Sequence, residues 1–222
     1  MKKYFAFFVL TFITASGYSQ NPPGTIGVGI VTERVDSTIV RMIKVIRAGQ
    51  SDIIAFPAAY SEKRNEGSAD TAEQRTYFTP DSMTLIKMNE ALKSQYCDAK
   101  RYRATTSYNH MIELFGKEWG KSYINEQKKA MKNELDYIDK NCTQKKIDLD
   151  SIDKQVIAFT SNKYKGNVLF IQLCDFRDDP YKLKERAKKQ MIDGWHGWFE
   201  TNLETFYYNI EQNKLSVHGE DF

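Results

Sequence analysis

The sequence predicts an α+β fold, in which an antiparallel sheet has several helices packed on one of its faces. Three observations lead to this class. Amphipathic helical patterns fill much of the stretch before residue 150, runs of β-branched and aromatic residues gather in the C-terminal third, and no internal repeat is visible. The helices carry apolar stripes that need a partner surface, and the predicted sheet supplies it.

Residues 1–19 are typical of a secretory signal peptide. Lys2 and Lys3 form its positive start, an apolar run follows, and Gly17 and Ser19 are the small residues that precede cleavage. The apolar run is too short to span a bilayer of about 30 Å, and no later stretch reaches roughly 20 apolar residues. We therefore expect export through the Sec pathway, to the periplasm or the extracellular space, with no transmembrane segment in the mature chain.

Removal of residues 1–19 lowers the formal net charge from +3 to +1, because two lysines leave and no acidic residue does. A charge this close to zero argues against nucleic acid as a partner and equally against an anionic membrane, since both need a concentrated basic surface. We expect residues 20–36 to be an extended segment and residues 37–222 to be a single α+β domain. Residues 61–76 lack large apolar side chains, which indicates a mobile surface loop within that domain.

Residues 38–46 fit two structures. Their apolar residues have helical spacing, with Asp36 or Ser37 as a cap, whereas their β-branched content favours a strand; we choose the strand. Residues 52–57 indicate a second short strand. Pro57 places this strand at an edge of the sheet, because proline cannot donate a hydrogen bond to a neighbouring strand.

Three helical patterns follow. The first begins with Thr79 as its cap, Pro80 in its first turn and Asp81 at the positive end of the helix dipole. The apolar stripes of the three patterns are, in chain order, Leu85, Met88, Leu92 and Tyr96; Tyr108, Met111, Ile112, Phe115 and Trp119; and Ile124, Met131, Leu135 and Ile138.

The next two runs, residues 155–160 and 168–173, predict a β-hairpin with a turn at Gly166. The second run is apolar on both faces, which indicates a central strand. A final hairpin is predicted from residues 206–210 and 215–217.

Between these hairpins the sequence predicts a helix. Asp178 or Asp179 can cap it, apolar residues recur every four positions, and Gly194 ends it.

Five features occur in a characteristic order: the signal peptide, Tyr77-Phe78-Thr79-Pro80, the strand at residues 166–171, the step Asp193-Gly194 and the final hairpin that ends at residues 217–220. In these features the chain resembles a loose group of small secreted bacterial proteins of unknown function. It departs at His218-Gly219 and at Trp195. The resemblance implies a cystatin-like fold, or one like nuclear transport factor 2, and it implies no activity.

The chain contains three cysteines, and two of them can pair in an oxidising compartment. Cys97 and Cys142 both close helical patterns, whereas Cys174 lies in an apolar run, where a free thiol behaves as a small buried hydrophobic group. A disulfide between Cys97 and Cys142 is therefore one interpretation, and three reduced structural thiols are the other.

His110 and Glu113 lie three residues apart on one face of a helix, where such a pair can bind a metal or act as a base with its orienting group. Further ligands are missing, because neither His-x-x-x-His nor Cys-x-x-Cys occurs, so we predict no metal and no cofactor. The aspartates of the segment Asp175–Asp179 gather after a central strand, where two carboxylates can act as acid and base. They match no calcium loop, and helix capping is their alternative role.

The most unusual local composition is Gly-Trp-His-Gly-Trp-Phe, which starts at Gly194. Trp195, His196 and Trp198 can line a groove for a peptide or a glycan, because aromatic faces stack on such ligands. Alternatively, the two tryptophans fill the gap between helix and sheet, while Gly194 ends a helix and Gly197 forms a bulge.

We therefore predict an exported, non-catalytic domain that binds an envelope or extracellular protein, a peptide or a glycan, without any indication of its oligomeric state. The alternative is a periplasmic hydrolase or metal-assisted enzyme that uses His110 with Glu113, His196, or the Asp175–Asp179 cluster.

Overall fold

The computed structural model describes residues 36–65, 75–144, 147–194, 197–218 and 222. The predicted signal peptide and nearly all of the predicted extended segment lie outside these residues. The strands are β1 (Lys44–Ala48), β2 (Ser51–Ala55), β3 (Thr76–Phe78), β4 (Asp153–Ser161), β5 (Gly166–Cys174), β6 (Leu203–Asn209) and β7 (Lys214–Ser216). The helices are α1 (Ser37–Met42), α2 (Ala58–Asn65), α3 (Ser82–Thr143), α4 (Leu183–Ala187) and α5 (Trp198–Asn202).

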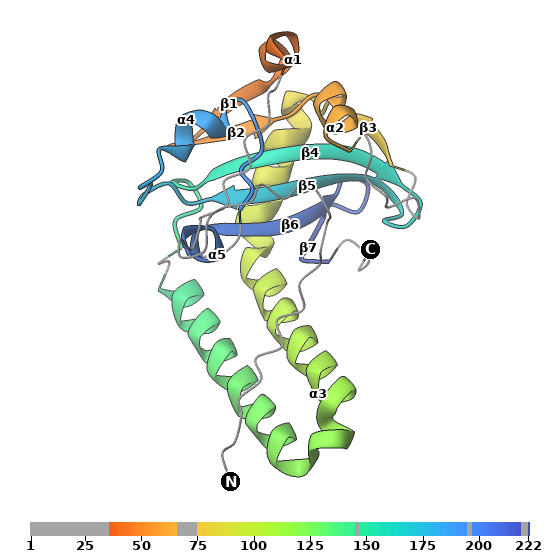
Figure 1. Ribbon diagram of the computed structural model, residues 1–222, viewed down its shortest axis with the longest axis vertical. Helices are drawn as coiled ribbons and strands as arrows, with labels where there is room; N and C mark the ends of the chain where they lie inside the picture. The colour runs from red at the N-terminus through yellow and green to blue at the C-terminus, as the bar shows by residue number, and fades with distance from the viewer. Residues whose placement is uncertain (1–35, 66–74, 145–146, 195–196, 219–221) are drawn as a thin grey trace, which may run out of the picture.

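The described strands form one sheet in the order β1-β2-β4-β5-β6-β7, and β3 pairs with β4 (Figure 1). Only β2 and β4 are parallel; the other pairs in this sheet are antiparallel. The predicted α+β class is confirmed. None of the described helices combines the length and the apolar character that crossing a bilayer requires.

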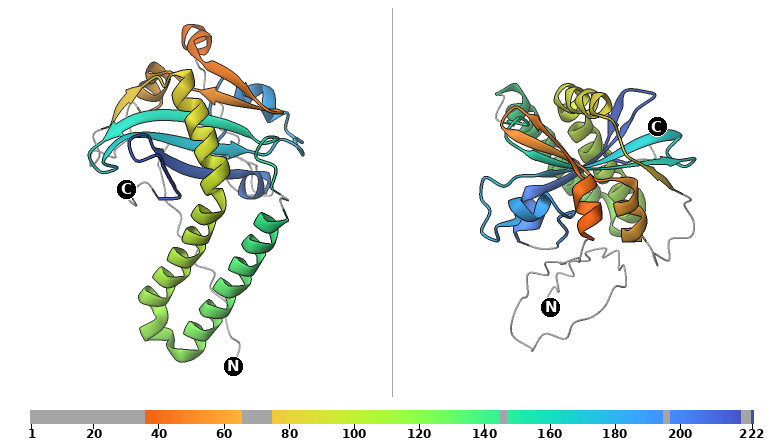
Figure 2. Two further views of the ribbon diagram at one scale, coloured as in Figure 1. Left: turned by 180° about the vertical axis from the view of Figure 1, so that it is seen from behind. Right: turned by 90° about the horizontal axis from the view of Figure 1, so that it is seen from above.

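Both faces of the sheet are covered, because successive residues of a strand point to opposite sides. On one face, Val156 and Leu169 pack with the first part of α3. On the other face, Phe159 and Val168 pack with side chains of α2, α4 and α5. Figures 1 and 2 show α3 on one side of the sheet and the three short helices on the other. Several helices pack on one face of the sheet, as expected. In addition, α3 covers the other face, which we expected to carry no helix.

Residues 38–46 divide into a helix and a strand. The Asp36 carboxylate accepts a hydrogen bond from the backbone N–H of Thr38 at 2.7 Å and so caps α1, which ends before β1. The strand prediction is wrong for the first half of the segment. Ile39 and Ile43, one helical turn apart, both pack against the sheet, so helical spacing and a cap outweigh the β-branched content.

β2 lies inside the sheet, between β1 and β4, and all of its residues are buried. The prediction of an edge strand is wrong because Pro57 comes after the strand and interrupts no hydrogen bonds between strands. The edge strand on this side is β1.

The polar segment at residues 61–76 begins and ends in regular structure. α2 extends to residue 65, and its Tyr60 hydroxyl accepts a hydrogen bond from the backbone N–H of Met191 at 2.8 Å. Thr76 begins β3. The loop prediction is therefore wrong at both ends, because buried Tyr60 holds α2 against the segment after α4 and β3 pairs with β4. Residues 66–74 lie outside the described residues.

The three predicted helices are one long element, α3. It begins after Asp81, whose carboxylate accepts a hydrogen bond from the backbone N–H of Thr84 at 2.7 Å. Thr79 is not the cap; its hydroxyl accepts from the backbone N–H of Ala58. The only non-helical residue inside α3 is Gly120, with φ 76° and ψ −170°, a left-handed conformation that favours glycine.

The chain reverses at Gly120, so α3 forms two antiparallel arms that project from the sheet (Figure 2). We call residues 98–141 the helical hairpin, with residues 98–119 as arm 1 and residues 121–141 as arm 2. At 1.5 Å per residue, the hairpin extends about 35 Å from its base to the turn.

The β4–β5 and β6–β7 hairpins are confirmed, and β5 has a neighbour on both sides, as predicted for a central strand. The predicted helix before Gly194 is much shorter. α4 ends at residue 187, and Met191 is buried outside it. The N-cap of α4 is Lys182 and not one of the predicted aspartates, but the Asp179 carboxylate still accepts from the first backbone N–H groups of the helix, those of Leu183 and Lys184 at 2.8 and 2.9 Å.

Two buried glutamines explain why α4 stops early. Gln155 of β4 donates to the backbone carbonyls of Ala187 and Gln190 at 2.8 and 2.7 Å, and its side-chain oxygen accepts from the N–H of Ile192 at 2.8 Å. Gln172 of β5 donates to the carbonyl of Ile192 at 2.6 Å. The backbone that would continue the helix is therefore bonded to the sheet.

The disulfide between Cys97 and Cys142 is confirmed, and it joins the two ends of the helical hairpin. Cys174 is free and buried, as predicted, and its burial raises the pKa of the thiol.

Replacing Cys97 and Cys142 together by serine should lower the free energy of unfolding by about 4 kcal/mol, because the bond closes a loop whose ends are 45 residues apart. Urea denaturation followed by circular dichroism measures this loss. Reducing the wild-type protein should give the same loss and leave the double variant unchanged. A loss below about 1 kcal/mol would show that the disulfide does not constrain the chain.

Candidate interaction surface on the helical hairpin

α3 buries two different apolar stripes. The first packs against the sheet and consists of Leu85, Met88, Leu92 and Tyr96. Beyond the sheet the apolar positions move round the helix and face the other arm, where Ala104, Tyr123 and Ile138 are buried. One continuous helix therefore contacts the sheet first and arm 2 afterwards.

Glu204 of β6 determines where arm 1 leaves the sheet. Its carboxylate accepts a hydrogen bond from the Tyr96 hydroxyl at 2.7 Å and forms ion pairs with Lys100 and Arg103. Arg103 also donates to the backbone carbonyl of Thr205 at 2.6 Å. Burial and the adjacent carboxylate raise the pKa of Tyr96, so its hydroxyl keeps the proton that it donates. These contacts fix the direction of the hairpin.

Polar contacts also join the arms. Arg101 of arm 1 donates to Asp139 of arm 2 at 2.6 Å, one turn beyond the disulfide. Further out, burial and a hydrogen bond to Glu134 raise the pKa of Tyr108. Near the turn, a Cβ on Gly116 would lie 3.1 Å from the Ile124 side chain, so glycine permits the close approach of the arms there.

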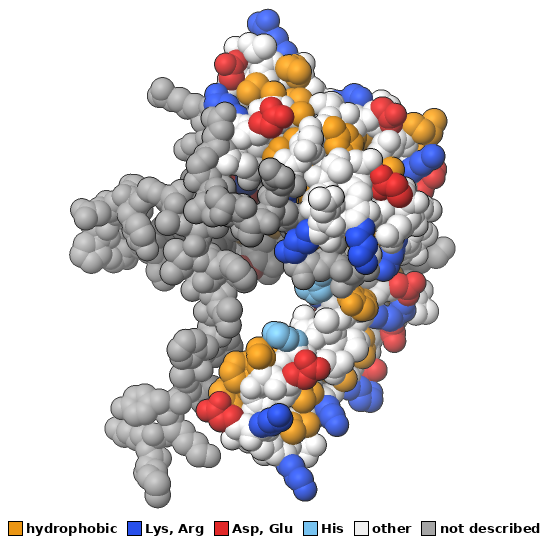
Figure 3. All heavy atoms as spheres, turned by 90° about the vertical axis from the view of Figure 1, so that its right-hand side faces the viewer, with side chains coloured by type: hydrophobic (Ala, Val, Ile, Leu, Met, Phe, Trp, Pro, Cys, Tyr) orange, Lys and Arg blue, Asp and Glu red, His pale blue; other side chains and the backbone are white. Residues whose placement is uncertain are grey.

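Half of the ten large hydrophobic side chains that are exposed among the described residues lie on the hairpin: Tyr102, Met111, Leu114, Trp119 and Tyr137. Figure 3 shows hydrophobic side chains gathered on the projecting arms. Such a concentration on one substructure is unusual, because isolated exposed hydrophobic residues scatter over most surfaces. Each arm buries only the side that faces the other arm, so these residues stay in contact with solvent.

Exposed hydrophobic residues occur both near the turn and near the base of the hairpin. Met111 and Leu114 lie in the last turns of arm 1 before the reversal. Tyr137 lies near the base of arm 2, close enough to Tyr96 to affect the pKa of Tyr96. We call Met111, Leu114 and Tyr137 the hairpin face; their exposed fractions are 38%, 53% and 68%.

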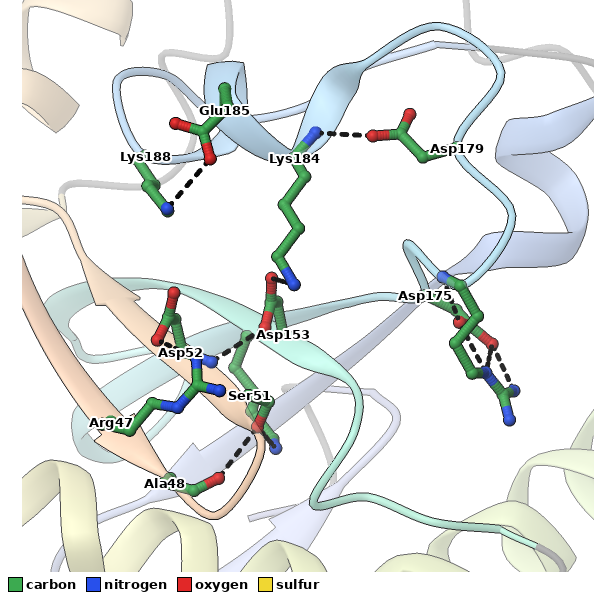
Figure 4. A network of polar contacts seen from close by, with 12 residues as sticks. Arg47, Ala48, Ser51, Asp52, Asp153, Asp175, Asp179, Lys184, Glu185 and Lys188 are labelled. Atoms are coloured by element: carbon green, nitrogen blue, oxygen red, sulfur yellow. Dashed lines mark hydrogen bonds and ion pairs between the residues drawn. The ribbon is translucent and has the colours of Figure 1, made fainter.

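A second polar arrangement lies at the end of the sheet, beside the turn between β1 and β2 (Figure 4). Asp153 is buried, and one of its carboxylate oxygens accepts from the backbone N–H of Asp52 at 2.8 Å. Its other oxygen is 3.6 Å from Lys184 Nζ. Arg47 pairs with Asp52 at 3.0 Å. These charges connect β1, β2, β4 and α4.

Lys154 is fully buried next to this arrangement. Its Nζ donates to the Ser51 hydroxyl at 2.9 Å and to the backbone carbonyl of Leu149. Burial lowers the pKa of Lys154 to about 8, and nearby Asp150 partly opposes this effect. A serine next to a lysine can be a nucleophile with its base, but Ser51 is also fully buried and out of reach of a substrate.

The residues predicted for metal binding or acid–base chemistry do not converge. His110 and Glu113 are both exposed on arm 1. In the part of the chain that the structure describes, no three His, Cys, Asp or Glu side chains are arranged to hold a metal ion. Asp175 pairs with Arg177 at 2.9 Å, which lowers its pKa, and Asp179 is committed to the first backbone N–H groups of α4.

Trp198 belongs to the core rather than to an open groove. It is buried beside Phe176 and Phe199, with ring centroids 5.7 and 5.4 Å away, and its indole N–H donates to the backbone carbonyl of Asp178. The core-filling alternative therefore holds for Trp198. Trp195 and His196, the other two residues of the predicted groove, lie outside the described residues.

The glycines around this segment have other roles than predicted. Gly197, with φ 60°, precedes α5 and is not a bulge. A Cβ on Gly194 would lie 2.6 Å from the Phe199 ring, so this glycine is required by close packing and not by the end of a helix.

Comparison with protein-family models, with curated proteins and with solved structures gave no match. The resemblance to small secreted bacterial proteins therefore stays a prediction, and the site has to be interpreted from its own geometry.

The sequence also contains a signal for the hairpin. Between residues 82 and 143 there is no proline, and Gly116 and Gly120 are the only glycines. A segment this long without proline is typical of a continuous helix, and two glycines four residues apart near its middle suit a reversal.

The free energy of unfolding should increase as the pH rises above about 8, because Lys154 loses its proton more easily in the folded chain. The pKa of Lys154 is about 8 in the folded chain and 10.5 in its ordinary state. Between these values the unfolded chain binds a proton that the folded chain does not, so the free energy of unfolding increases with pH, by up to roughly 3 kcal/mol. Below about pH 8 both states carry the proton, and the contribution is constant.

Urea denaturation at about pH 7 and about pH 9.5 tests this dependence against Lys154→Met, which removes the amine and keeps most of the side-chain volume. The stability difference between the two proteins should shift in favour of the wild type at the higher pH. An unchanged difference would show that Lys154 titrates in the folded protein as it does in water.

Proposed function

We propose that the protein is an exported, non-catalytic binding domain whose helical hairpin binds a protein partner in the envelope or outside the cell. The observation that supports this most directly is the hairpin face, which lies exposed on an arm held by a disulfide and by the contacts of Glu204. Export rests on the signal-peptide pattern of residues 1–19.

The composition of the hairpin face suits a protein partner. Methionine and aromatic side chains are enriched in the centres of protein interfaces, and Met111 and Tyr137 supply both kinds. Exposed charged residues, Glu113 and Lys117 among them, flank the apolar residues and can form the polar rim of an interface. The arms already hold each other, so binding would order few additional groups.

A catalytic function has less support. The enzyme alternative requires His110, Glu113 or the Asp175–Asp179 cluster to meet around a substrate, yet the first two are exposed on the hairpin and Asp175 is paired with Arg177. No observation favours the hydrolase or metal-assisted enzyme over binding, so we do not propose it. The hairpin also replaces the segment around Trp195 as the proposed recognition element.

The double substitution Met111→Gln with Leu114→Gln should weaken partner binding by at least about tenfold, because it removes two of the three apolar side chains of the hairpin face. A photo-reactive phenylalanine at position 137 first identifies the partner as a discrete covalent adduct in cells that export the protein. Calorimetry with the purified partner then measures the loss of affinity.

The matched control is Met83→Gln with Ile86→Gln, which changes two comparably exposed hydrophobic residues at the opposite end of α3. Its affinity for the partner should equal that of the wild type. If both double variants bound equally well, or if position 137 gave no adduct, the hairpin face would not be the recognition surface.

A further inference from the structure

The turn of the hairpin carries an aromatic cluster that begins next to Leu114 of the hairpin face. Trp119 stacks on Phe115 with ring centroids 5.1 Å apart, and its edge meets Tyr123 at 4.7 Å. Trp119 is nevertheless 54% exposed. Gly120 beside it has open space where a side chain would lie. We call Phe115, Trp119 and Tyr123 the apex cluster.

Exposed lysines flank the apex cluster. Lys117 precedes Trp119 and Lys121 follows it, while Lys128 and Lys129 are exposed two turns along arm 2. The carboxylates nearby are Glu113, Glu118 and Glu126, so four lysines face three glutamates in this part of the hairpin. Aromatic rings with adjacent lysines are the composition that proteins place at the boundary between water and lipid headgroups.

The Tyr123 hydroxyl is a second, independent observation. It is buried beneath Trp119 and has no hydrogen-bond partner among the described residues. A buried hydroxyl without a partner destabilises the packing around it. A surface that draws the Trp119 ring outward and offers oxygen acceptors would supply the missing partner, and lipid phosphate and ester groups are such acceptors.

We propose that the apex cluster docks on an anionic lipid bilayer, with the rings of Trp119 and Phe115 among the headgroups and Lys117 and Lys121 against their phosphates. Binding of this kind is peripheral: a small apolar group inserts among the headgroups, and basic residues contact the phosphates. Each of the two contributions is weak alone, and together they give measurable binding. The hairpin is long enough, at about 35 Å, to hold the sheet away from the membrane.

The near-neutral net charge that argued against an anionic membrane describes the whole chain. A bilayer contacts only the end of the hairpin, and electrostatic attraction fades within about 8 Å in physiological salt. The charges this close to the turn are those of Lys117 and Lys121 against that of Glu118, which leaves one positive charge beside Trp119. The proposal goes beyond the protein-binding function, because it concerns the turn of the hairpin and a different kind of partner.

Co-sedimentation with vesicles tests the proposal, using the mature chain with its disulfide intact. Vesicles of phosphatidylethanolamine with phosphatidylglycerol should bind the protein, and vesicles of phosphatidylcholine alone should bind it much more weakly. Trp119→Ala should lower partitioning onto the anionic vesicles roughly tenfold. Lys117→Gln and Lys121→Gln should each lower it about fivefold, and added salt should weaken binding of the wild type.

Matched controls lie on the same hairpin. Tyr137→Ala removes a more exposed aromatic ring near the base, and Lys132→Gln removes an exposed lysine midway along arm 2. Both should bind vesicles like the wild type. Circular dichroism of every variant checks that α3 is intact, and brominated lipids should quench the fluorescence of the wild type but not that of Trp119→Ala.

Equal binding of all variants, or no preference for the anionic vesicles, would overturn the proposal. The proposal would also be overturned if the protein did not bind vesicles and if substitutions in the apex cluster abolished the protein adduct at position 137. The apex cluster would then belong to the protein interface. Trp119→Ala separates the two proposals, since it should lose the vesicles and keep the protein adduct at position 137.

Discussion

The structure depends on one constraint: a single helix has to bury two apolar stripes against two different surfaces. The stripe that ends with Tyr96 packs on the sheet, and the stripe around Ala104 packs on arm 2. The sheet cannot cover the second stripe, so the chain has to turn back and cover it with its own continuation. Gly120 permits the reversal, and the disulfide between Cys97 and Cys142 joins the ends of the resulting loop.

This arrangement separates the buried core from much of the exposed hydrophobic surface. The sheet and the first part of α3 contain the larger apolar core, while the hairpin contributes little buried area and keeps half of the exposed large hydrophobic residues of the described chain. A thin two-helix arm is held in one conformation by Glu204, by the pair Arg101 and Asp139 and by the disulfide. A surface that is fixed before binding loses little conformational entropy on association, which suits a recognition element.

Local patterns in the sequence predicted several elements and missed the way in which distant ones meet. The strands around Gly166, the final hairpin and the disulfide follow from periodicity, turn residues and cysteine placement. The early end of α4 does not, because it depends on Gln155 and Gln172, which reach its backbone from strands far away in the sequence. Trp198 is a second example. The aromatic segment around it suits a binding groove as well as a core, and only the packing of Trp198 in the folded chain decides between the two. The sequence predicted three separate helices in place of the hairpin. The apolar stripe of α3 moves to another side of the helix, and such a shift looks like the start of a new helix.

Hydrogen–deuterium exchange of the backbone amides, measured along α3 in the oxidised and the reduced protein, tests most directly whether the hairpin is a preformed arm held by its disulfide. The account predicts that amides in both arms are protected in the oxidised protein, and that reduction of Cys97 and Cys142 removes this protection while β4 and β5 stay protected. Rapid exchange throughout the arms of the oxidised protein, or protection that reduction leaves unchanged, would contradict it.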